Sequence, residues 1–203
     1  AKNIGILMGE EASLRMPLED FEKLKSEIDG TFSDCSKIIK KVRLIKSEKE
    51  ILILKNICSV ANRSFDRANR LFFSGQPLNE AFREFKITLL EEGAEEVPYL
   101  VGGAGRDGYV DVISPPSSKP LENGDILMLD TGSTLKGYFC DFDRNWAIGT
   151  ASDIAKRAYS KLHKVTELAL DEIRPGMTCE EVFKLINNDL GGGSSNIGRM
   201  GHG

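Results

Sequence analysis

Two aspartates in the middle of the chain, Asp130 and Asp141, have the spacing of residues that do chemistry together. They lie in two strand-like runs separated by a polar turn near Leu135 and Lys136, a pattern that predicts a β-hairpin. If residues whose numbers sum to 271 are paired, the two aspartates face each other on one side of the hairpin, with Cβ atoms roughly 5 Å apart. The sequence therefore predicts two carboxylates at one place.

Two carboxylates at that distance repel each other, and the apolar residues around them predict partly buried strands, where the repulsion is costly. Either a proton shared by the pair or a divalent cation held between them would relieve it. His202 favours the cation, because its glycine neighbours let the backbone approach a site while the imidazole projects into it. A lone histidine in a glycine-rich loop is commonly a surface residue, so the inference depends on all three residues.

The stretch LDTGSTLKGYFCDFDRNWAIG, followed later by GHG, resembles the pita-bread metallopeptidases, which include methionine aminopeptidase, aminopeptidase P, prolidase and creatinase. The resemblance implies that Asp130, Asp141 and His202 are ligands in a centre of two divalent metal ions, Mn, Co, Fe or Zn. Upstream, RLIKSEKEI resembles the start of the catalytic domain in the aminopeptidase P, prolidase and creatinase branch. IGILMG and RMPLEDFEKL resemble the end of that branch's N-terminal domain.

The fold that this resemblance implies is of the α+β class, a curved antiparallel sheet with flanking helices that is incomplete at the C-terminus. Residues 1–40 are then expected to be the remnant of a creatinase-like N-terminal domain with its linker, and residues 41–203 an incomplete pita-bread catalytic domain.

Local patterns predict the elements. Capping boxes at Ser47 to Glu50 and at Thr178 to Glu181 predict two helix starts. The expected helices cover residues 17–30, 47–73, 78–93, 152–173 and 178–190. The expected strands are IGILM, YLVGG, GYVDVIS and the two arms of the hairpin, while the stretch TFSDCSKIIKKVRLIK is expected to be a connector with short extended pieces.

Three features depart from the family pattern. Two further glutamate ligands are expected downstream of His202, and without them we expect an incomplete metal site and an inactive fragment. Ile113 stands where these peptidases usually carry a histidine, and an isoleucine cannot hydrogen-bond a substrate. Asp143 replaces a threonine common among relatives, and we expect it either to orient a ligand carboxylate on its own face or to pair with Arg144 or Lys136.

The remaining conspicuous side chains have structural interpretations. His163 lies in a predicted surface helix and is expected to be solvated, and Trp146 is expected to belong to the core. The four cysteines form no CxxC pair, so we expect free, small apolar residues: Cys35, Cys58, Cys140 and Cys179.

Charge and hydropathy exclude several classes of partner. The chain has 27 basic and 31 acidic residues without a long run of one sign, so neither nucleic acid nor an anionic membrane is an expected partner. The longest aliphatic run, residues 51–54, is far shorter than the ~20 residues that span a bilayer. Two glutamates lie where a signal peptide would place its cleavage region, and we expect a cytoplasmic protein.

The activity implied by the resemblance is hydrolysis, by a metal-activated water, of the bond before proline in short peptides, in a branch whose members often form homodimers. One alternative is a relative that acts on a small non-peptide molecule, by C–N hydrolysis of the ectoine or creatine type or by dimethylsulfoniopropionate lysis, and Ile113 favours it. The other is a non-catalytic binding module, which retention of both aspartates and His202 disfavours.

Overall fold

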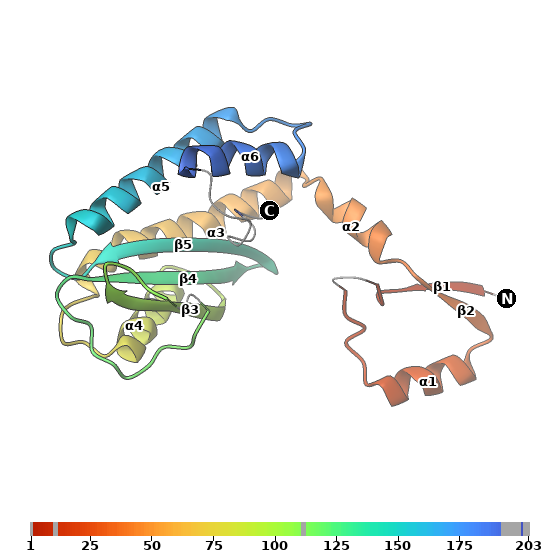
Figure 1. Ribbon diagram of the computed structural model, residues 1–203. Coiled ribbons are helices and arrows are strands. Elements are labelled where there is room, and N and C mark those ends of the chain that lie inside the picture. Colours follow the sequence, from red (N-terminus) through yellow and green to blue (C-terminus); the bar gives the residue numbers. More distant parts are fainter. Residues whose placement is uncertain (1, 10–11, 111–112, 192–199, 201–203) are drawn as a thin grey trace. The chain divides into compact units, whose positions relative to one another are not determined.

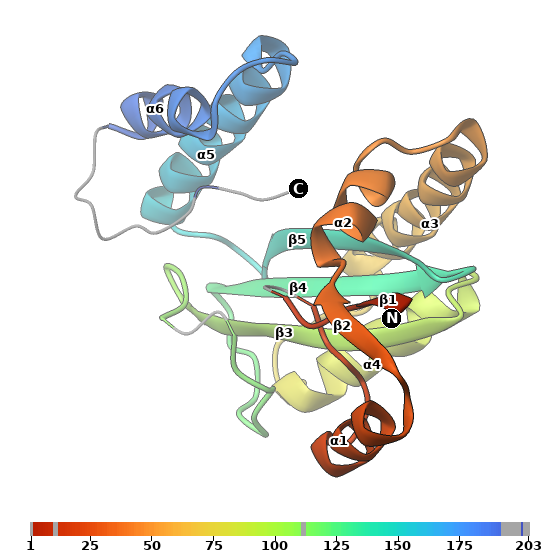
Figure 2. The same ribbon diagram turned by 90° about the vertical axis from the view of Figure 1, so that its right-hand side faces the viewer.

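The structure, a computed structural model, describes residues 2–9, 12–110, 113–191 and 200 (Figures 1 and 2). The chain divides into two compact units, residues 1–55 and residues 56–203, and the division falls inside helix α3 (Glu48–Asp66). The predicted domain division after residue 40 stays a prediction.

The first unit contains two parallel strands joined through a helix. β1 (Lys2–Ile6) pairs with β2 (Gly30–Asp34), and α1 (Leu18–Glu27) forms the crossover that a parallel pair requires. The rings of Phe21 and Phe32 meet edge to face at 5.7 Å, which fixes α1 on the strands. The expected first strand and first helix are therefore confirmed.

Helix α2 (Ser36–Leu44) follows β2 and corrects one expectation. A connector with short extended pieces was predicted here, and it is wrong for residues 36–44. The apolar residues Ile38, Ile39 and Val42 recur at helical spacing, and the lysines and arginine between them are good helix formers.

The second unit is built on an antiparallel sheet with the strand order β3-β4-β5. Its strands are β3 (Glu96–Arg106), β4 (Asp125–Leu135) and β5 (Tyr138–Ala147). Its helices are α3, the short 3₁₀ helix η1 (Ala68–Arg70), α4 (Leu78–Glu91), α5 (Asp153–Glu172) and α6 (Cys179–Leu190). α3 and α4 lie along one face of the sheet (Figures 1 and 2).

The core of this unit lies between those two helices and the sheet. Phe65 of α3 and Phe85 of α4 are both buried, and their rings lie 4.8 Å apart. Trp146 of β5 stacks on Phe65 at 5.5 Å, which confirms its expected place in the core. Leu127 and Leu129 of β4 are buried in this core, whereas Met128 between them is buried on the other face of the sheet.

Both predicted capping boxes are present. The Ser47 backbone N–H donates to Glu50 Oε2 at 2.6 Å, and the Glu50 N–H returns a bond to Ser47 Oγ at 3.4 Å. Thr178 and Glu181 form the same reciprocal pair at the start of α6. The predicted end of the first of these two helices near residue 73 is wrong, because α3 ends at Asp66 and is followed by η1.

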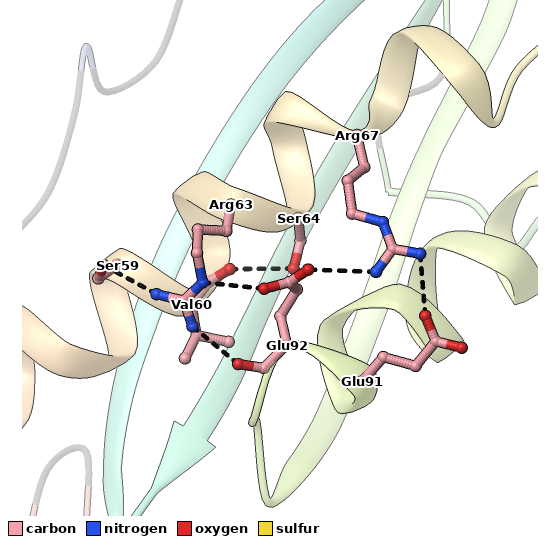
Figure 3. A network of polar contacts seen from close by, with 7 residues as sticks. All are labelled: Ser59, Val60, Arg63, Ser64, Arg67, Glu91 and Glu92. Carbon is pink, nitrogen blue, oxygen red and sulfur yellow. Dashed lines mark hydrogen bonds and ion pairs between the residues drawn. The ribbon is translucent and has the colours of Figure 1, made fainter.

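The C-terminus of α4 is attached to α3 by two arginines (Figure 3). Arg63 donates from Nε to Glu92 Oε2 and from Nη2 to the Glu92 carbonyl, both at 2.8 Å. Arg67 donates to Glu92 Oε1 at 3.1 Å and to Glu91 Oε2 at 2.9 Å. One glutamate therefore receives charge-assisted bonds from Arg63 in the last turn of α3 and from Arg67, the residue that follows the helix.

The hairpin between β4 and β5 has a two-residue turn. Lys136 and Gly137 both have positive φ, 52° and 77°, as a type I′ turn requires. Leu135 therefore pairs with Tyr138, and paired residue numbers sum to 273. The predicted turn at residues 135 and 136, and the register of 271 that followed from it, are wrong because the residue that readily accepts positive φ is Gly137.

Two further findings bear on the remaining expectations. Among described residues 107–110 and 113–119 the structure has no strand, so the expected strand in GYVDVIS is wrong there. Within the ranges that the structure describes, no helix combines the length and the apolar character needed to cross a membrane.

Candidate functional site

The observed register changes which acidic residues are paired but leaves them on the same face of the sheet. Asp130 lies directly opposite Asp143, and Asp141 lies opposite Gly132, one pleat further along. Because side chains two residues apart in a strand share a face, all three carboxylates still project from the sheet face opposite the helix-covered core. The expectation that Asp143 shares a face with Asp141 is confirmed.

The carboxylates of Asp130 and Asp141 converge on the hydroxyl of Tyr99. This hydroxyl lies 2.5 Å from Asp141 Oδ1 and 3.1 Å from Asp130 Oδ1. A phenol carries one proton, so it donates to only one of these oxygens at a time. Burial, then the hydrogen bond to Asp141 and the charges of both aspartates, hold the pKa of Tyr99 well above its ordinary value, and the phenol stays a donor at neutral pH.

Gly132 makes this convergence possible. Tyr99, Gly132 and Asp141 form one row across the three strands. A Cβ atom on Gly132 would lie 1.9 Å from Phe139 Cζ and 2.5 Å from the Cys140 carbonyl oxygen. The absence of a side chain in the middle strand therefore leaves room for the Phe139 ring, and the Tyr99 ring packs beside that ring while its hydroxyl reaches Asp141 of β5.

Asp143 adds a third carboxyl group to this face. Burial, followed by the negative charge of Asp130, raises its pKa to about 6, and Arg144 acts in the opposite direction. The residue as a whole is exposed, so the shift in its pKa arises from atoms close to the carboxyl group and not from enclosure of the side chain. The guanidinium of Arg144 lies 5.1 Å from the centre of the Phe142 ring and donates to the Asp143 backbone carbonyl at 2.7 Å.

The remaining residues that the sequence analysis singled out have separate outcomes. His202 lies outside the described residues. Ile113 is 75% exposed, and His163 is exposed on α5, as expected for a solvated helical residue. All four cysteines are free, as predicted; Cys140 is buried, whereas Cys179 is exposed and does not fit the expectation of an apolar packing residue.

A pocket of about 420 Å³ opens where the ends of β4 and β5 approach α5. Ile126 and Asn145 line it from the carboxylate face of the sheet, and Tyr159 and Leu162 line it from α5. Tyr109 also lines the pocket, and its hydroxyl donates to Asn145 Oδ1 at 2.8 Å. The pocket is mostly apolar and lies on the same face as the acidic residues.

Tyr99 is the site residue that the sequence did not reveal. Its stretch, YLVGG, is expected to be a strand, and β3 confirms that expectation. Which residues Tyr99 meets depends on how β3 pairs with β4 across the long connection of residues 107–124, and on an irregularity in the pairing between Glu96 and Tyr99. No local signal sets that register.

Comparison with known proteins assigns the family. Residues 53–203 match the family described as metallopeptidase family M24, and the chain belongs to that family. Membership implies divalent metal ions. The predicted resemblance to the pita-bread metallopeptidases and the α+β pita-bread fold class are confirmed.

Relatives with dipeptidase names extend over most of the chain. It is 26% identical over 202 residues to a Xaa-Pro dipeptidase from Pyrococcus horikoshii, covering 97% of this chain and 56% of the relative. It is 28% identical over 170 residues to a probable dipeptidase, PepE, from Mycobacterium tuberculosis, covering 82% and 45%. The crystal structure of the X-Pro aminopeptidase from Thermotoga maritima superimposes with a TM-score of 0.81 at 26% identity, covering 93% and 52%. The chain thus spans about half the length of these relatives.

The donor atoms present fit a divalent cation. Two carboxylates converge at one place, and oxygen donors of this kind suit Mg²⁺, Mn²⁺ and related hard ions. In the part of the chain that the structure describes, no group of three or more His, Cys, Asp or Glu side chains is arranged to hold a metal ion. Asp130 and Asp141 therefore supply part of a ligand set, and the predicted third ligand, His202, lies outside the described residues.

Proposed function

We propose that the protein is a metal-dependent hydrolase that cleaves the bond before proline in short peptides. The observation that carries the proposal is the convergence of Asp130 and Asp141 in a member of metallopeptidase family M24. The substrate class rests on similarity to relatives named Xaa-Pro dipeptidase and X-Pro aminopeptidase.

Asp130, Asp141 and His202 would hold the metal, which we propose to be two divalent ions of Mn, Co, Fe or Zn. When bound, such ions activate water for attack and polarise the scissile carbonyl. The two carboxylates concentrate negative charge on the sheet face opposite the core. The apolar pocket on that same face offers a place that a small substrate side chain can enter while excluding water.

The test uses the protein expressed from its complete coding sequence. With Mn²⁺ or Co²⁺ added, it is expected to hydrolyse Xaa-Pro dipeptides and Xaa-Pro tripeptides but not the matching Xaa-Ala peptides. Asp130→Asn and Asp141→Asn should each lower kcat/KM by at least about 100-fold, because each removes a charged metal ligand. Asp20→Asn, an exposed carboxylate of α1, should leave kcat/KM unchanged.

Metal content is measured in the same preparations. A protein that purifies with stoichiometric metal and turns over no Xaa-Pro peptide would rule out the peptidase. A protein that binds no divalent ion at all would instead favour the non-catalytic binding module.

A second candidate is a hydrolase or lyase that acts on a small non-peptide molecule. It is favoured by Ile113, which stands where peptidases of this kind usually carry a histidine and cannot donate a hydrogen bond to a substrate. Turnover of ectoine-type, creatine-type or dimethylsulfoniopropionate substrates by the metal-loaded protein, without turnover of Xaa-Pro peptides, would select this candidate. A homodimer and a cytoplasmic location stay predictions, which light scattering and cell fractionation would test.

A further inference from the structure

Two half-buried tyrosines, Tyr99 and Tyr109, project their hydroxyls over the acidic face of the sheet, and they have different partners. The Tyr99 hydroxyl lies between Asp141 and Asp130, whereas the Tyr109 hydroxyl donates to Asn145. Only the first hydroxyl contacts the carboxylates that we propose as metal ligands.

The Tyr99 side chain is fixed independently of those carboxylates. Its ring packs beside the Phe139 ring at a centroid distance of 5.8 Å. Its backbone carbonyl accepts a hydrogen bond from Thr131 Oγ1 at 3.0 Å, in addition to the pairing of β3 with β4. The position of the hydroxyl is thus supported by contacts that do not involve the carboxylates.

We propose that Tyr99 is a positioning residue that orients the carboxylates of Asp141 and Asp130 for the cation. The inference rests on the proposed function, because it requires that these aspartates bind metal. A hydrogen bond to one carboxylate oxygen narrows the range of χ angles that the side chain adopts, and it thereby directs the other lone pairs of the group. Outer hydrogen bonds of this kind typically contribute 10–100-fold to metal affinity.

The experiment measures Mn²⁺ binding to the metal-free, complete protein by isothermal titration calorimetry. Tyr99→Phe keeps the ring against Phe139 and removes only the hydroxyl, so Kd is expected to rise about 10–100-fold. Tyr109→Phe is the matched control, since it removes a hydroxyl from a half-buried tyrosine on the same face. Its Kd is expected to stay close to that of the wild type.

Thermal unfolding of the metal-free variants separates orientation from general stability. A lower unfolding temperature for Tyr99→Phe with an unchanged Kd would overturn the inference and leave the proposed function standing. If the wild type binds no Mn²⁺, Co²⁺, Fe²⁺ or Zn²⁺, the inference and the proposed function fail together.

A second measurement does not depend on the folding of Tyr99→Phe. Adding Mn²⁺ to the wild type should change the near-ultraviolet circular dichroism of tyrosine, because the partners of one phenol become ligands. The Tyr109→Phe protein should keep that change in full. Absence of the change in a wild-type protein that does bind Mn²⁺ would also overturn the inference.

Discussion

At Gly132 the middle strand leaves a space that the Phe139 side chain of β5 occupies. Phe139 leans over it from β5, and the Tyr99 hydroxyl passes across it towards Asp141. A larger residue here would disturb the packing of the hairpin and the position of the carboxylate at the same time.

Gly132→Ala should therefore destabilise the protein. At a strand position with free space, replacing glycine by alanine would stabilise the folded protein by ~0.4–1 kcal/mol, because it lowers the conformational entropy of the unfolded chain. Here the new Cβ would lie 2.5 Å from a backbone oxygen, so we expect a loss of about 1–3 kcal/mol in the free energy of unfolding. Urea unfolding checks this, and a transition midpoint at or above that of the wild type would contradict it.

Residue spacing in the sequence was sufficient to place Asp130 and Asp141 together, because the two fall on one face of a short local hairpin under either register. Tyr99 was not predictable, since its contact with them depends on strand pairing between distant segments. The pairing of Asp141 with Gly132 was not predictable either, because it depends on the turn lying at residues 136 and 137.

At the scale of elements, the ion pairs between the α3 end and the α4 end make the stability of the fold depend on pH (Figure 3). Hydrogen bonds from Arg63 and then from Arg67 hold the pKa of Glu92 below its ordinary value. A carboxylate whose pKa is depressed by folding stabilises the folded state above the unfolded-state pKa. That contribution is lost as the pH falls through the folded-state pKa.

Glu92→Gln is expected to lower the urea midpoint at pH 7, because it removes the charge that both arginines share. The difference from the wild type should stay constant down to about pH 5 and shrink below about pH 4, as Glu92 becomes protonated in the wild type. Glu91→Gln is the control, since Glu91 pairs with one arginine, Arg67, among the residues that the structure describes and is more exposed, so its effect should be smaller. A difference that is independent of pH would argue against the network.

Elements with strong local signals were predictable and those with weak signals were not. Capping boxes fixed the starts of α3 and α6 because the reciprocal bonds involve residues only three positions apart. α2 was missed because its apolar residues are mostly exposed and its sequence is rich in lysine, which gives little contrast between a helix and a connector.

At the scale of the whole molecule, the α+β class and the family could be predicted from the resemblance of one hairpin motif and its neighbours, and the family match and the solved relatives confirm both. The pairing of β3 with β4 could not, because it joins segments across the long connection of residues 107–124. The proposed site draws on β3, β4 and β5, so it exists only when that distant pairing has formed.

Metal binding should accordingly stabilise the whole fold. A ligand that binds only the folded protein contributes about 2.7 kcal/mol at a concentration 100 times its Kd. Removing metal from the complete protein with a chelator should lower its melting temperature, and adding Mn²⁺ should restore it. The melting temperature of Asp130→Asn should change with neither treatment. A wild-type melting temperature that is the same after chelation and after addition of Mn²⁺ would contradict metal binding at this site.

The Lys136–Gly137 turn limits how this chain can diverge over evolution. Its two residues can be exchanged for others that tolerate positive φ, such as asparagine followed by glycine. An insertion or deletion of a single residue would shift every pairing after it and turn the acidic face of β5 towards the helices. Homologous sequences that keep both aspartates should therefore vary in the composition of this turn but not in its length.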